Sequence, residues 1–205
     1  SKGEGLGNQF LGNIREVDAI LHVVRCFEDD NVVHVDGSVN PVRDKEIIDL
    51  ELILKDIETV EKRLDKYKKQ AKSGNKEDVR AVEHCSALLK HLENSQPARN
   101  FETDDESKAI LVEMMLLTDK PILYVCNVDE NSFPDGNKLT REFEKAIEGE
   151  PAEIILICAG IEADIAALDS AEERKEFLEA MGLEEPGVNR LIRKSYQLLN
   201  LVTYF

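Results

Sequence analysis

The chain has 205 residues, of which 42% are hydrophobic and 33% are charged, so it is long and apolar enough to form a globular core rather than a disordered chain. Its formal net charge of −16 argues against a general affinity for nucleic acid, and DNA is not an expected partner, because binding to phosphates needs clustered Lys and Arg. No apolar stretch approaches the roughly 20 residues that cross a bilayer, so a membrane protein is not expected.

Residues 1–18 are expected to form a glycine-rich loop followed by a short helix. The apolar run 19–27 does not alternate polar with apolar residues, which predicts a parallel strand buried on both faces. From 44 to 72 and from 76 to 93 the spacing predicts two helices that form an antiparallel hairpin. The apolar stripe that we expect the first of these helices to bury consists of Ile47, Leu50, Leu54, Ile57 and Leu64, widened by Ile53, Val60 and Tyr67.

The rest of the chain alternates helical patterns with two more apolar runs that read as strands. In order, these are a helix that begins at a capping box, Thr103–Glu106, a strand over 121–126, a helix near 140–148, a strand over 154–159, and helices opened by Asp169 and Pro186. This order predicts an α/β fold, a mostly parallel sheet with flanking helices. The predicted domains are 1–40 with 102–205 for the sheet, and 41–101 for the inserted helical hairpin.

The segments after two of the strands are candidates for a binding site, because ligands bind beyond the carboxyl ends of strands in open α/β sheets. Asn127-Val128-Asp129-Glu130 can present an amide and a carboxylate to the edge of a nucleotide base. An ordinary Asx turn is the alternative for this segment. Cys158-Ala159-Gly160 can let backbone N–H groups approach a ligand, and a plain strand-to-helix turn is its alternative.

Other motifs carry less information. Gly3-x-Gly5-x-Gly7 does not fit a phosphate-binding loop and on spacing alone is a flexible loop. Four cysteines without a C-x-x-C pair are interpreted as buried reduced thiols in a cytoplasmic protein, with redox sensing as the alternative. The histidines show no metal-ligand spacing, and no catalytic triad can be inferred.

Residues 61–80 are basic within this acidic chain. Eight cations stand against four carboxylates, a local charge of +4. A solvated helical face is one interpretation, and a basic surface that contacts RNA phosphates is the other. The candidate contacts are Lys62, Arg63, Lys66, Lys68, Lys69 and Lys72.

Several strings together resemble the Obg-like ATPase family, called YchF in bacteria, within the translation-factor-related P-loop NTPases. They are Ser1–Leu11, Ala19–Phe27, Asn127–Glu130, Glu184–Arg190 and Leu198–Phe205. The resemblance implies a P-loop G domain with an inserted coiled-coil-like domain, followed by a TGS domain. It implies a cytoplasmic ATPase that associates with ribosomes or rRNA and uses Mg²⁺ with ATP.

The same resemblance suggests roles for individual residues. Gly3, Glu4, Gly5, Leu6 and Gly7 would belong to switch II. Asn127 and the Val128 backbone would contact adenine, and Glu130 would mark the position at which GTPases carry the Asp that pairs with guanine. The Cys158-Ala159-Gly160 segment would line the base side of the pocket in a loop before the next helix.

The phosphate-binding loop, the Mg²⁺ ligands of switch I and the TGS domain of this family are not found in the chain. The chain begins without Met and ends in an apolar stretch, so we expect a fragment without catalytic residues, inactive alone. The leading hypothesis is an ATP-hydrolysing regulator of translation. GTP as substrate, an NTPase that does not recognise the base, and a non-catalytic coiled-coil interaction module remain alternatives.

Overall fold

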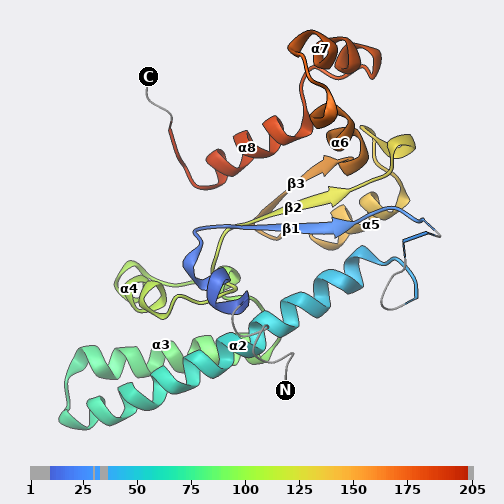
Figure 1. Cartoon of the computed structure of the whole chain (residues 1–205). Helices are drawn as coiled ribbons and strands as arrows, with labels where there is room; N and C mark the ends of the chain where they lie inside the picture. Colours follow the sequence, from blue (N-terminus) through green and yellow to red (C-terminus); the bar gives the residue numbers. More distant parts are fainter. Residues whose placement is uncertain (1–9, 30, 33–36, 203–205) are drawn as a thin grey trace. The chain divides into compact units, whose positions relative to one another are not determined.

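The computed structural model describes residues 10–29, 31–32 and 37–202, and it divides into two compact units that are described separately (Figure 1). The sheet unit contains residues 19–45 and 121–205, and the helical unit contains residues 1–18 and 46–120. These units differ from the predicted division, which placed 1–18 and 102–120 with the sheet and 41–45 with the hairpin. Their equivalence to a G-domain portion and an inserted domain stays a proposal.

The sheet has three parallel strands in the spatial order β1-β2-β3, which confirms the predicted α/β fold class. The strands are β1 Ile20–Arg25, β2 Ile122–Asn127 and β3 Ala152–Ile157, each within two residues of its predicted bounds. The register pairs Arg25 with Asn127 and Asn127 with Ile157, so the three carboxyl ends are level.

Helices pack on both faces of the sheet (Figure 1). One face buries Tyr124 and Cys126 against Phe143 of α5 (Lys138–Ala146) and Ile161 of α6 (Ala159–Ala167). The Tyr124 and Phe143 rings meet edge to face with their centroids 5.1 Å apart. The other face packs against α8 (Gly187–Leu198), while α7 (Ala171–Ala180) adds Leu178 to the first core.

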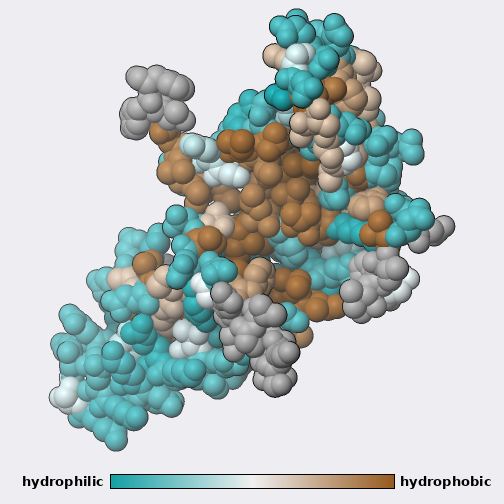
Figure 2. Space-filling model, viewed as in Figure 1, coloured by the Kyte–Doolittle hydropathy of each residue, from teal (hydrophilic) through white to brown (hydrophobic). Residues whose placement is uncertain are grey.

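The prediction that every strand is buried on both faces is correct for β2 and wrong for β1. Residues Ile122–Cys126 are all buried, whereas Leu21 and Val23 of β1 are 44% and 64% exposed. The reason is that α8 packs on β2 and β3, while no described element covers this side of β1. Hydrophobic side chains gather on the molecular surface near the strands (Figure 2).

The helical unit is built on a hairpin. Helix α2 (Pro41–Gln70) begins in the sheet unit and continues into the helical unit, and a short 3₁₀ turn joins it to α3 (Lys76–Glu93). The core between the two helices contains Ile53, Val60, Cys85 and Leu88. It is completed by Leu111 and Met114 of α4 (Asp105–Met114) and by Leu116, which explains why residues after 101 belong to this unit.

The stripe predicted for α2 was partly wrong. Ile47, Leu50 and Leu54 are exposed, and the neighbouring row that contains Ile53, Val60 and Leu64 is buried. Both rows have three-four spacing, so the spacing does not distinguish them. Contacts with α3 and with residues 110–116, which are distant in sequence, determine which row is buried.

Two helix starts also differ from the predictions. Asp104 rather than Thr103 is the N-cap of α4, because its carboxylate accepts the Ser107 N–H at 2.8 Å. Helix α5 starts two residues early, since Asn137 and Thr140 form a capping box. The two ends of α7 lie closer to their predicted positions. Ser170 caps α7, and Gly182 takes a positive φ just after that helix.

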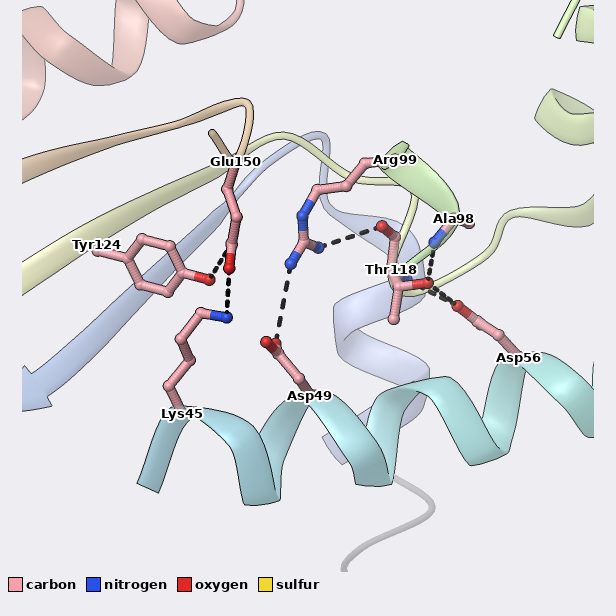
Figure 3. Close-up of polar contacts among 8 residues, drawn as sticks. All are labelled: Lys45, Asp49, Asp56, Ala98, Arg99, Thr118, Tyr124 and Glu150. Atoms are coloured by element: carbon pink, nitrogen blue, oxygen red, sulfur yellow. Dashed lines mark hydrogen bonds and ion pairs between the residues drawn. The ribbon is translucent and has the colours of Figure 1, made fainter. Parts of the chain in front are cut away.

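A buried carboxylate joins α2 to the segment after α4 within the helical unit (Figure 3). Asp56 accepts hydrogen bonds from the Leu117 N–H at 2.8 Å, the Thr118 N–H at 2.8 Å and the Thr118 hydroxyl at 2.7 Å. All three residues are buried. Burial raises the pKa of Asp56, and the three hydrogen bonds oppose that shift.

A second polar cluster lies in the sheet unit, at the first turns of α2 (Figure 3). Lys45 is buried and its Nζ lies 2.7 Å from Glu150 Oε1. The Tyr124 hydroxyl donates to the other oxygen of Glu150 at 3.3 Å. This cluster explains why residues 41–45 belong with the sheet rather than with the hairpin.

We expect Asp56→Ala to lower the free energy of unfolding by about 3 kcal/mol, because three buried donors lose their acceptor. Glu61→Ala, which removes an exposed carboxylate from the same helix, is the matched control and should change it by less than about 0.5 kcal/mol. Urea denaturation followed by circular dichroism measures both. Equal effects of the two substitutions would contradict the assignment of Asp56 as a structural acceptor.

Candidate nucleotide-base pocket

The structure brings together the two segments that the sequence singled out. The Val128 N–H donates to the Ile157 carbonyl oxygen at 2.9 Å, which extends the pairing of β2 and β3 by one residue. The Ala159 N–H then donates to Asn127 Oδ1 at 3.0 Å. The turn after β2 is therefore bonded directly to the turn after β3. That either contacts a nucleotide base stays a prediction.

A pocket of about 430 Å³ opens at this end of the sheet. Three segments contribute to its wall, one from the carboxyl end of each strand. The lining residues are Phe27, Glu28, Asp29, Asn127, Val128, Asp129, Glu130, Asn131, Cys158, Ala159 and Gly160.

The segment 27–29 was not among the predicted site residues. The sequence nevertheless indicated this segment as a possible part of the site, because it follows an apolar strand just as the other two segments do. It carries no motif by which its residue types would have been chosen. Its assignment to the pocket required the parallel pairing of β1 with β2.

Asn127 has a defined orientation. Its side-chain oxygen accepts the Ala159 N–H, while its amide nitrogen has no hydrogen-bond partner in the described part of the chain. Two N–H donors are therefore available to an acceptor in the pocket, such as a ring nitrogen of a purine.

The three residues after Asn127 have different roles. Val128 has a buried side chain and its N–H is bonded to Ile157, so only its carbonyl oxygen is available to a ligand. Asp129, rather than Asn127, makes the local turn, because its carboxylate accepts the Ser132 N–H at 2.9 Å. Glu130 is exposed, and its Oε1 would lie 3.4 Å from a Cβ placed on Gly160. An alanine Cβ at position 160 would therefore make an ordinary contact with Glu130.

Residues 158–160 differ from the loop that the resemblance implied. Cys158 is the N-cap of α6, and Ala159 and Gly160 form the first turn of that helix. Backbone N–H groups in a first helical turn have no carbonyl partner inside the helix. One of them, on Ala159, is already used by Asn127.

Helix α6 is also joined to the start of α8. The Glu162 carboxylate accepts the Gly187 N–H at 2.6 Å and the Val188 N–H at 3.1 Å. The N-cap of α8 is Pro186, which makes no side-chain cap, so Glu162 supplies the acceptor from another helix. A Cβ at position 187 would lie 2.7 Å from Glu162 Oε1, so any other residue there would displace the Glu162 carboxylate from these two bonds.

The remaining predicted residues lie away from the pocket. The switch II candidates Gly3–Gly7 fall outside the described residues. The basic candidates are in the hairpin of the helical unit, where Arg63 donates to the Glu113 carbonyl oxygen at 3.2 Å. The five candidate lysines 62, 66, 68, 69 and 72 are exposed.

All four cysteines are buried as free thiols, and burial raises the pKa of Cys85 to about 11. Within the described ranges, no group of three or more His, Cys, Asp or Glu side chains is placed to bind a metal ion. No helix among the described residues has both the length and the hydrophobicity needed to cross a bilayer.

A parallel sheet with helices on both faces and a pocket beyond its carboxyl ends places the chain among the open-sheet α/β proteins. No family model matches the chain. It is 50% identical over 207 residues to the ribosome-binding ATPase YchF of Bacillus subtilis (strain 168) and 49% identical over 205 residues to that of Escherichia coli O157:H7. Both alignments cover 100% of this chain and 56% of the relative.

A solved structure, that of the Schizosaccharomyces pombe YchF GTPase, matches with a TM-score of 0.82 and 32% identity over 94% of this chain and 53% of that chain. Over its whole length the chain is therefore homologous to part of the YchF proteins, and the predicted family is confirmed. The chain spans about half the length of these relatives.

Proposed function

We propose that the protein to which this chain belongs is a regulatory ATPase that associates with ribosomes, and that this chain supplies the base-side half of its nucleotide site. The phosphate-binding loop and the Mg²⁺ ligands would lie in residues outside the chain. Gly3–Gly7 would belong to switch II. The similar proteins are named ribosome-binding ATPase and GTPase, and the similarity of this chain to them supports the proposal.

One observation carries the proposal. Two segments separated by about thirty residues converge on one pocket through the bond from the Ala159 N–H to Asn127 Oδ1. That bond leaves the Asn127 amide donors available and places them beside the first turn of α6. An amide held in this way suits the edge of a purine, where adenine and guanine both present N7.

Preference between the two purines depends on Glu130. In GTPases of the wider superfamily an Asp at this position pairs with guanine, as the sequence resemblance implies. Glu130 is exposed, and no hydrogen bond or ion pair holds its carboxylate among the described residues. A carboxylate without fixed orientation pairs weakly with the N1–H and 2-amino groups of guanine, so GTP loses the advantage that it has in those GTPases, which supports ATP with GTP as the alternative.

The direct test measures binding of ATP and GTP to the full-length protein by isothermal titration calorimetry. We expect ATP to bind at least about tenfold more tightly than GTP. The reverse order would support the GTPase alternative, and no binding of either nucleotide would reject the proposed function in favour of an interaction module.

We expect Asn127→Ala to weaken ATP binding by at least about tenfold, because the amide donors and the bond to Ala159 are both lost. Asn189→Ala, which truncates an exposed asparagine on α8, is the matched control and should bind ATP normally. Unchanged affinity of the Asn127 variant would instead favour an NTPase that does not recognise the base.

Ribosome association is proposed for the lysines of the hairpin. Lys62, Lys66 and Lys69 are spaced so that they share one face of α2, and Lys68 and Lys72 are four residues apart. None of these lysines forms a hydrogen bond or an ion pair with another described residue. The distal half of the hairpin is hydrophilic (Figure 2).

The two arginines nearby differ from these lysines. Arg63 donates to a carbonyl oxygen, and Arg80 forms ion pairs with Asp104 and Glu106. Both therefore stabilise the helical unit, and the lysines are the better candidates for contacts with phosphates. This surface also suits the alternative in which the hairpin docks an acidic protein.

Replacing Lys66, Lys68, Lys69 and Lys72 together with Glu should weaken co-sedimentation with ribosomes, most strongly at low salt. A matched control replaces four other exposed lysines, Lys108, Lys138, Lys145 and Lys175, with Glu, so that the change in net charge is the same. Equal losses for the two variants would show a general charge effect, and no loss for the first would reject this surface as the ribosome contact.

A further inference from the structure

The segment that forms the third wall of the pocket is held by one side chain. Arg25 is the last residue of β1. Its Nε donates to the Phe27 carbonyl oxygen at 3.0 Å, and its two terminal nitrogens donate to the Val32 oxygen at 2.9 Å and the Asp29 oxygen at 3.4 Å. Its guanidinium also lies 4.7 Å from the centre of the Phe27 ring. A single planar group thus contacts the segment at three points.

Little else in the described chain holds this segment. Cys26, just before it, is fixed by Asn127 and Asn137, whose groups lie 2.8 Å and 2.7 Å from its backbone nitrogen and oxygen. Within 27–32, the other hydrogen bonds between described residues are local. They join Asn31 and the Val32 N–H to Asp29. Among the described residues, the hydrogen bonds that reach this segment from outside all come from Arg25.

The chemistry of arginine matters here. Its five N–H donors lie in one plane, so a single group can reach several carbonyl oxygens, and its charge makes each bond stronger than a neutral one. The same flat cation can stack on an aromatic ring. Lysine is a compact point charge on a flexible chain, and it cannot reproduce this arrangement.

We propose that Arg25 is a positioning residue that fixes the 27–29 wall of the pocket and thereby sets the affinity for the base of the nucleotide. The proposal rests on the proposed function, since it assigns the pocket to a base. Arg25 is not among the residues that line the pocket, so its effect acts through Phe27, Glu28 and Asp29. Arg25 should therefore affect recognition of the base and leave binding of the phosphates unchanged.

The test compares Arg25→Lys and Arg25→Gln with the unchanged full-length protein, using ATP and inorganic tripolyphosphate as probes in calorimetry. Both variants should bind ATP about tenfold more weakly and tripolyphosphate within about twofold of normal. Amide exchange over 27–32 should become faster in both variants. Arg141→Lys, at an exposed arginine on α5, is the matched control and should change none of these values.

The outcomes separate the two proposals. If the unchanged protein binds no ATP, the proposed function itself fails. If it binds ATP and Arg25→Lys binds equally well, Arg25 does not position the pocket. Parallel losses for ATP and tripolyphosphate would show a general structural role and overturn the inference. If Arg25→Gln does not fold, Arg25→Lys, which keeps the charge, decides between these outcomes.

Discussion

Strand β2 forms hydrogen bonds with β1 on one side and β3 on the other, and the position of the pocket depends on this pairing. The register makes the three strands end together, so the chain leaves the sheet at three adjacent points. Parallel pairing requires long connections, and a helical hairpin and several helices provide them. Residues about one hundred positions apart, such as Phe27 and Asn127, therefore line one pocket.

Each of these three exits is held by a different side chain. The Arg25 guanidinium holds the segment after β1, the Asp129 carboxylate accepts the Ser132 N–H after β2, and Asn127 Oδ1 accepts the Ala159 N–H after β3. All three use a side chain to satisfy backbone groups that regular structure leaves free.

The sequence predicted the strands well, because continuous apolar runs such as 121–126 have few other interpretations. It also placed Asn127 and Ala159 at strand ends, and their bond confirmed that the two turns meet. The prediction failed on α2, where two helical stripes fit the spacing equally well. On α2, Ile53 and Leu54 both fit a helical stripe, and only contacts with α3 and the segment after it decided that Ile53 is the buried one. Arg25 gave no signal at all, because its role consists of contacts with carbonyl oxygens that every residue carries.

Strand β1 pairs with β2 along one edge, and no described strand pairs with its other edge. The backbone groups along such an edge are a template for another strand, and here they stand beside the uncovered side chains of Leu21 and Val23. A preparation of this chain alone would therefore tend to self-associate as its concentration rises. Detergent screens or fusion to a solubility tag would then matter more for its handling than its high negative charge suggests.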